Sequence, residues 1–171
     1  MRIGFFAALS WAAAALAQSG ALLVPSPRVA RTPPEQPLPF SHKLHSAQGL
    51  RCGQCHPVPG NGDFATLPAT AVCMGCHQSV RKDSPHIARL AQFHRENQLV
   101  PWRPVYRIPE WISFNHRKHV AAAQVNCETC HGAVAQREAL AREKDISMQA
   151  CMDCHRAKNA SNECIVCHDP R

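Results

Sequence analysis

The sequence predicts a mostly irregular fold with short α-helices and little or no β-sheet, in which bound groups take the place of an apolar core. The chain has 171 residues, of which 14 are prolines and only 6% are aromatic. Because proline interrupts both helices and sheet ladders, long regular elements are not expected. Much of the hydrophobic share of 45% lies in the first two dozen residues and in the ten cysteines. Little apolar material is therefore left to build a core, and the chain needs another support.

All ten cysteines fall in five copies of a C-x-x-C-H pattern. This pattern is the attachment signature of c-type haem. Two thiols at this spacing can reach the two vinyl groups at one edge of a porphyrin, and the next histidine can bind the iron. We number these attachment sites first to fifth in chain order. The thioether cysteines are Cys52, Cys55, Cys73, Cys76, Cys127, Cys130, Cys151, Cys154, Cys164 and Cys167, and the proximal histidines are His56, His77, His131, His155 and His168.

Three other interpretations of the cysteines are weaker. A disulfide framework gives no reason for a histidine after every second cysteine, and pairing within C-x-x-C closes only tiny loops. Structural zinc draws two C-x-x-C pairs into one tetrahedral site, and five pairs cannot be divided in that way. A thioredoxin-like redox motif needs a surrounding βαβ pattern, which is absent. Five covalently bound c-type haems are therefore the predicted cofactors.

Five haems need up to five distal ligands, and eleven histidines less the five proximal ones leave six. Four of the six occur in two copies of one motif, FSHKLH at 40–45 and FNHRKH at 114–119. Histidines three apart on a helical turn share one face and can serve two neighbouring haems. The predicted distal ligands are thus His42, His45, His116 and His119, although any single histidine of this kind could also be a solvated surface residue.

Two further residues are candidates for a distal position. His94 follows the apolar stripe of a predicted helix over 85–97, which starts at Pro85 after Ser84. It is either a haem ligand or a half-buried side chain on a packing helix. Met148 precedes the fourth attachment site, and a thioether can bind haem iron. It is a candidate ligand of the fourth haem or, alternatively, a buried gap-filler.

The chain is predicted to consist of two related modules behind an exported amino terminus. Residues 40–100 form a first two-haem module, 101–113 an extended Pro-rich linker, and 114–171 a second module with three haems and a helix over 133–144. Residues 1–17 have the form of a cleaved signal peptide, and 3–24 could instead be an uncleaved anchor. Residues 18–39 read as a Pro-rich tether. Either way, the predicted location is the periplasm, soluble or held at the outer face of the inner membrane.

These motifs resemble the class III, low-potential multihaem cytochromes c, in which F-x-H-x-x-H precedes C-x-x-C-H. The segments PWRPVYRIPEW at 101–111, CETCHG at 127–132 and ISMQACMDCHR at 146–156 are similar to the pentahaem subunit of alternative complex III and of related molybdopterin-type quinone oxidoreductases. The resemblance implies that His42 closes the first haem, His116 the third, His119 a later one such as the fifth, and His45 another, such as the second.

The resemblance implies a mostly bis-His haem wire, not an enzyme by itself, that carries electrons by outer-sphere transfer as a subunit of a membrane quinol-oxidising respiratory complex. Its partners would be redox proteins of that complex. The alternatives are a soluble periplasmic electron shuttle and a small-molecule reductase or oxidase with one open haem. The formal charge of +7 is interpreted as compensation of haem propionates, and a nucleic-acid partner is not expected.

Overall fold

A computed structural model describes residues 32–168 of the chain. The predicted signal peptide, the anchor and most of the tether lie outside the described residues. Among residues 32–168 there is no helix with the length and apolar character needed to cross a membrane.

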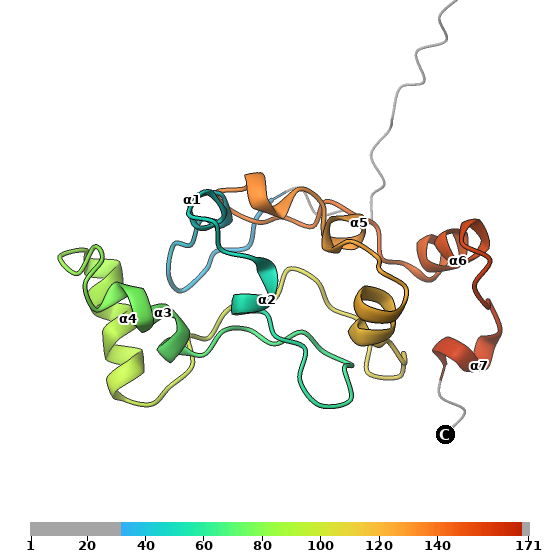
Figure 1. Ribbon diagram of the computed structural model, residues 1–171, viewed down its shortest axis with the longest axis horizontal. Coiled ribbons are helices and arrows are strands. Elements are labelled where there is room, and N and C mark those ends of the chain that lie inside the picture. Colours follow the sequence, from blue (N-terminus) through green and yellow to red (C-terminus); the bar gives the residue numbers. More distant parts are fainter. Residues whose placement is uncertain (1–31, 169–171) are drawn as a thin grey trace, which may run out of the picture.

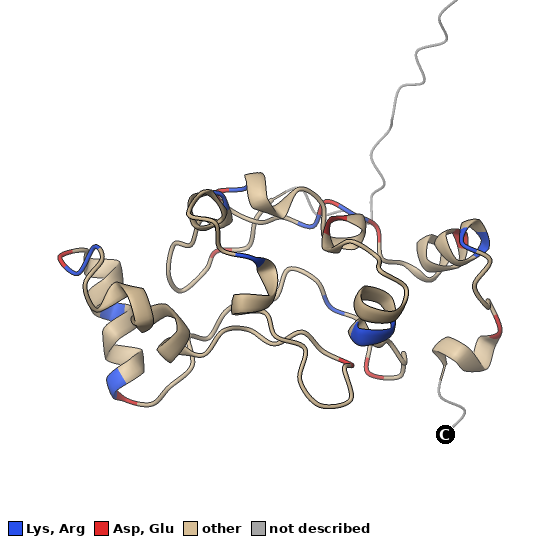
Figure 2. Ribbon diagram, in the orientation of Figure 1, with Lys and Arg blue, Asp and Glu red and all other residues tan. Residues whose placement is uncertain are grey.

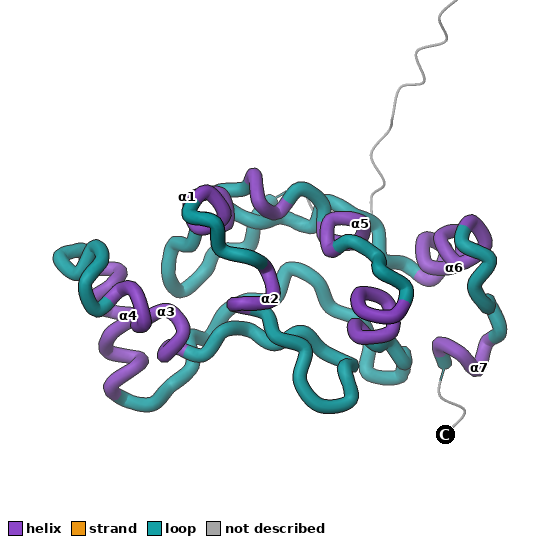
Figure 3. The backbone as a smooth tube through the Cα atoms, viewed as in Figure 1, coloured by secondary structure: helices purple, strands orange, loops and turns teal. Residues whose placement is uncertain are grey.

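Short helices joined by long loops make up the described part of the chain (Figures 1 and 3). Residues 32–168 contain no β-strand beyond an isolated antiparallel bridge between Ile112 and His168, which confirms the predicted fold class. The elements in order are α1 (His42–Ala47), α2 (Cys52–Cys55), α3 (Thr70–His77), α4 (Pro85–Arg95), the π-helical turn η1 (Lys118–Ala122), α5 (Cys127–His131), the 3-10 turn η2 (Val134–Gln136), α6 (Met148–Ala157) and α7 (Cys164–Cys167).

Every C-x-x-C pair lies on a helix, namely α2, α3, α5, α6 or α7. Residues three apart on a helix point from the same face, so the two thiols of each pair are presented together. Local capping starts some of these helices. The Ser147 hydroxyl accepts from the backbone N–H of Ala150 before α6, and the Asn126 side chain accepts from Glu128 before α5.

The helices follow one another along the long axis of the molecule (Figure 1). The packed pair α3 and α4 lies at one end, α2 and α5 lie in the middle, and α6 and α7 lie at the other end. Helix α4 starts at Pro85 as predicted and ends at Arg95, two residues earlier than expected. It ends there because Asn97 takes a left-handed conformation with φ of 51°. No helix forms over residues 101–109, as their prolines predict.

Very little of the described chain is a conventional core. The buried apolar residues are Leu90 of α4 together with Leu38 and Val100, and partly buried side chains of α3 and α4 pack against them. Many large apolar side chains on the other helices remain exposed, among them Leu44 on α1 at 53% and Ile165 on α7 at 74%. Side chains of this kind normally gain about 1.5–3 kcal/mol when buried. The polypeptide alone therefore leaves apolar surface uncovered on the helices that carry the attachment motifs and their neighbours.

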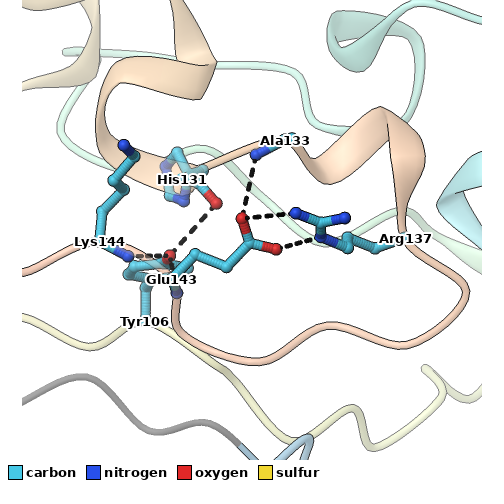
Figure 4. A network of polar contacts seen from close by, with 6 residues as sticks. All are labelled: Tyr106, His131, Ala133, Arg137, Glu143 and Lys144. Carbon is cyan, nitrogen blue, oxygen red and sulfur yellow. Dashed lines mark hydrogen bonds and ion pairs between the residues drawn. The ribbon is translucent and has the colours of Figure 1, made fainter. Parts of the chain in front are cut away.

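The helix predicted over 133–144 is absent, and that prediction was wrong. Only the 3-10 turn η2 forms. The chain then turns back, so that the Glu143 side chain reaches Ala133 at the beginning of the same segment (Figure 4). The Glu143 carboxylate accepts from the Ala133 N–H at 3.2 Å and from the Arg137 guanidinium, with Nη2 at 3.2 Å. This pairing holds the pKa of Glu143 below its usual range, chiefly through the hydrogen bond from Arg137. Tertiary hydrogen bonding thus overrides the helical pattern.

Tyr106 fixes the same loop from the Pro-rich linker (Figure 4). Its hydroxyl donates to the His131 carbonyl at 3.2 Å and accepts from the Glu143 N–H at 2.9 Å and the Lys144 N–H at 3.3 Å. Its ring packs edge-on to the His131 imidazole with centroids 4.8 Å apart. One side chain therefore ties the linker, the loop and the third attachment site together.

Replacing Tyr106 by Phe should lower the free energy of unfolding by about 1–3 kcal/mol, since half-buried backbone groups lose their hydrogen-bond partner while the ring contact stays. Denaturant titration of the full chain measures the change. Tyr106→Trp, which keeps aromatic bulk but misplaces the donor, should not restore the loss. A midpoint for Tyr106→Phe equal to that of the wild type would show that the hydroxyl does not hold the loop.

Candidate functional site

The two copies of the duplicated motif have nearly the same local geometry. In the first, Phe40 packs edge-on to His42 with ring centroids 4.8 Å apart and stacks on His45 at 4.3 Å. In the second, Phe114 does the same with His116 at 4.8 Å and His119 at 4.5 Å. The phenylalanine therefore acts as a spacer that sets the directions of both imidazoles.

Capping residues repeat as well. The Ser41 hydroxyl accepts from the Leu44 N–H at 3.0 Å, and the Asn115 side chain accepts from the Lys118 N–H at 2.8 Å. Each motif thus contains the capping residue that starts the helical turn carrying its two histidines. The turns differ in one respect, since the first continues as the α-helix α1 and the second as the π-helical turn η1. A π-turn is rare and frequently marks a functional site.

Each histidine of the two motifs faces a histidine of an attachment site. The ring centroids are 6.4 Å apart for His42 and His56, 6.2 Å for His45 and His77, 6.5 Å for His116 and His131, and 6.1 Å for His119 and His155. Four attachment sites, the first to the fourth, thus have an imidazole opposite the proximal one.

The spacing of these pairs fits a single metal atom between the two rings. Two imidazoles on opposite sides of one metal atom have centroids about 6 Å apart, because each metal–nitrogen bond is about 2 Å long and each nitrogen lies about 1 Å from its ring centroid. The four pairs span 6.1 to 6.5 Å. The residues present therefore fit the bis-His iron ligation that the motifs predict.

Backbone carbonyls orient the paired imidazoles. The Nδ1 atom of six of the eight rings lies within hydrogen-bond distance of a carbonyl oxygen, and a donated Nδ1–H leaves Nε2 free to bind a metal. The partners are Ser41 for His45, Thr66 for His56, Val80 for His77, Asp63 for His116, Asn115 for His119 and Ser161 for His155, at 2.6 to 3.0 Å.

Burial keeps two of the paired histidines neutral. Desolvation, followed by the neighbouring His56 and His45, lowers the pKa of His42 to about 4. Desolvation also lowers the pKa of His131, with contributions from His116 and His56. A neutral imidazole has the free electron pair that metal binding requires, so burial prepares these side chains for the ligand role.

None of the ten cysteines forms a disulfide. Burial raises the pKa of Cys55, Cys73, Cys127, Cys130 and Cys151, whereas a catalytic or redox-active cysteine has a lowered pKa. Residues 32–168 also contain no group of three or more His, Cys, Asp or Glu side chains that could hold a metal ion by themselves. The site chemistry thus consists of thiol pairs beside imidazole pairs.

Thiols of different attachment sites approach one another in an order that differs from the order along the chain. After burial, a nearby thiol of another attachment site also raises the pKa of four cysteines. This thiol is Cys55 for Cys73, Cys52 for Cys127 and Cys154 for Cys130, and for Cys151 it is both Cys130 and Cys167. These thiol contacts place the second attachment site beside the first, the first beside the third, the third beside the fourth, and the fourth beside the fifth. The sites therefore follow one another in space as second, first, third, fourth and fifth. Figure 1 agrees in that α3, α2 and α5 follow one another along the long axis and α6 and α7 lie together at the far end.

A loop of the first module supports a histidine of the second. The Asp63 carbonyl lies 2.8 Å from His116 Nδ1, and the Asn115 side-chain amide donates to Asp63 Oδ1 at 2.8 Å and to the Asn61 carbonyl at 2.9 Å. Gly62 lies between these residues with φ of 91°, and a Cβ there would approach Arg117 Cβ to 2.4 Å. The sequence carries little signal of this support, apart from a glycine-rich PGNGD stretch between two haem motifs.

The structure bears on three residues whose role the sequence left open. His119 faces His155 of the fourth site and not His168 of the fifth. An imidazole thus already faces the proximal histidine of the fourth site, where Met148 was the candidate ligand. His94 faces no proximal histidine, because its Nδ1 lies 3.3 Å from the Thr70 hydroxyl in the α3–α4 pair.

The sequence of the chain is similar to those of known cytochromes. Residues 112–169 match the family of cytochrome c7 and related cytochromes c. The chain is also 31% identical over 161 residues to "Menaquinone reductase, multiheme cytochrome c subunit" of Nitratidesulfovibrio vulgaris (strain Hildenborough), an alignment that covers 78% of this chain and 77% of that protein.

The support of His116 by the loop at 61–63 can be tested with two glycines of that loop. Gly60→Ala and Gly62→Ala both place a side chain at positive φ, but nothing lies within 4 Å of a Cβ at Gly60. Gly62→Ala should therefore destabilise the protein by at least about 1 kcal/mol more than Gly60→Ala, because only it displaces Arg117 and the adjacent His116.

The measurement is thermal unfolding of both variants, with the absorbance spectrum of the haem-loaded protein as a second readout. Gly62→Ala should also show a partial high-spin signal, from weakened ligation beside His116, that Gly60→Ala lacks. Equal stability and equal spectra of the two variants would show that this loop does not position His116.

Proposed function

The chain belongs to the multihaem cytochrome c subunits of quinone oxidoreductase complexes, and on this premise we propose that it carries five c-type haems in the periplasm and conducts electrons between partner subunits of such a complex. It is an electron-transfer subunit and not a catalytic enzyme. The observation that carries the proposal is the set of four facing imidazole pairs, each 6.1 to 6.5 Å apart and each beside a C-x-x-C pair.

The proposed ligand assignments follow from these pairs. His42 and His56 hold the first haem, His45 and His77 the second, His116 and His131 the third, and His119 and His155 the fourth, while His168 is the proximal ligand at the fifth site. When bound, each haem supplies an iron that changes its charge by one electron without forming a bond to a substrate.

The residues of the chain keep these sites closed and fixed. In the four paired sites, a bound iron would have an imidazole on each side, and no position would be left at which a substrate could bind. The carbonyl partners of Nδ1 prevent the rings from turning, which limits the structural change that accompanies a change of charge. The exposed apolar side chains of α1 and α7 would be covered by the porphyrins.

Basic side chains are spread from the α4 end to the α6 end rather than gathered in one place (Figure 2). A distribution of this kind favours local compensation of haem propionates at each site over a nucleic-acid surface. Each neighbouring Lys or Arg would also favour the reduced iron, which carries one positive charge fewer, and so raise the reduction potential of the nearest site.

The order of the sites supports a proposal for where partners would bind. The second site, on α3 beside α4, and the fifth site, on α7, are the two ends of the series (Figure 1). Electrons would enter at one end and leave at the other, so the chain would have two docking regions. The name of the relative assigns it to quinone reduction, and we propose this direction for the present chain in place of the quinol-oxidising direction that the sequence resemblance implied.

Purification of the tagged full-length chain from membranes in mild detergent tests this proposal. The expected result is a complex that contains membrane subunits and reduces a menaquinone analogue, with about five haems per copy of this chain by pyridine haemochrome assay. A fully soluble chain without partners would favour the periplasmic shuttle. A haem content near zero would overturn the haem assignment itself.

A further inference from the structure

The fifth site differs from the other four because no imidazole faces its proximal histidine. All eleven histidines lie within residues 32–168, and in that range His168 makes no ring contact with another histidine. Four of the remaining histidines already face the first four sites, which leaves His86 and His94.

Both of these histidines lie at the α3–α4 end of the molecule, away from the fifth site. His86 and His94 are on α4, which packs against α3 beside the second site. His94 is also engaged with the Thr70 hydroxyl at 3.3 Å. The fifth site on α7 lies at the opposite end (Figure 1). A histidine of this chain is therefore not the sixth ligand at the fifth site.

The fifth site is held beside α6 and the end of the linker. Asn162 lies two residues before α7 begins, and its side-chain amide donates to the Met152 carbonyl of α6 at 3.2 Å. On the other side, the Ser113 N–H donates to the Cys167 carbonyl at 2.8 Å, and His168 bridges to Ile112. The side chains available to His168 therefore come from α6 and from residues 111–113.

Met148 is the first residue of α6 and the soft ligand best placed for this role. It lies one helical turn before Cys151, a thiol that neighbours Cys167 of the fifth site. Its side chain is 64% exposed, which is unusual for an apolar residue that fills a core gap. Met152 is half-buried, and Met74 packs against the core at the α3–α4 end.

We propose that the Met148 thioether is the second axial ligand of the iron at the fifth site, opposite His168. The inference rests on the proposed function, since it assumes that the fifth site holds haem. A thioether favours ferrous iron more than a second imidazole does, so His–Met ligation raises the reduction potential. The fifth site is then the most oxidising of the series and the terminal electron acceptor within this chain.

The first test is Met148→Leu in the haem-loaded full-length chain. The reduced wild type should not bind carbon monoxide, whereas the variant should gain one high-spin haem that binds about one carbon monoxide per chain. Met74→Leu and Met152→Leu are matched controls and should leave the spectrum unchanged. Met148→His should restore the low-spin spectrum while the highest potential in a redox titration falls.

A second variant separates the fifth site from the fourth. His119→Ala should open the fourth site alone, so His119→Ala combined with Met148→Leu should bind about two carbon monoxide molecules per chain. If the double variant binds only as much as His119→Ala, the two residues serve one iron and the inference is wrong.

Two further outcomes would also overturn it. One is an unchanged spectrum in Met148→Leu, and the other is stoichiometric carbon monoxide binding by the wild type, which would mean that the fifth site lacks an internal ligand. Haem content is measured in every sample. A count of five with either outcome rejects only the role of Met148, whereas a wild-type count below five rejects the proposed function.

Discussion

Each facing pair of imidazoles must be held about 6 Å apart, and the rest of the structure serves this constraint. The two rings of a pair come from different turns of the chain, so no single helix can set their distance. The phenylalanine of each F-x-H-x-x-H motif stacks on one histidine at 4.3 or 4.5 Å and meets the other edge-on at 4.8 Å. Backbone carbonyls then fix ring rotation through Nδ1. The weak apolar core is consistent with a fold organised around these pairs.

The two modules depend on each other. The loop at 61–63, which follows the first attachment site, holds His116 of the third site through Asp63 and Asn115. In the reverse direction, α1 of the first module packs against η2 of the second, and the Lys43 N–H donates to the Arg137 carbonyl at 3.0 Å. Because these contacts join the first and third sites, the spatial order of the sites departs from their order in the chain. The contacts between the two halves thus form one continuous series of sites.

Local chemistry was predictable from the sequence, and long-range pairing was only partly so. The C-x-x-C-H spacing predicts its own helical turn, and the start of α4 follows from Ser84 and Pro85. The partner of His119 was expected at the fifth site, because sequence distance does not reveal that η1 lies beside the fourth. The helix over 133–144 failed for a similar reason, since Glu143 forms tertiary bonds to Ala133 and Arg137 that no periodicity records. The support of His116 by Asp63 spans 53 residues and has no local pattern.

We propose that the chain holds its redox centres in one series whose spatial order is second, first, third, fourth, fifth. Anomalous X-ray scattering at the iron edge, recorded on crystals of the haem-loaded protein, tests it most directly because it locates each iron independently of the polypeptide. The structure predicts that the first iron lies between the second and the third, with the second and fifth irons at the two ends. Irons arranged in chain order, or a first iron at one end of the series, would contradict it.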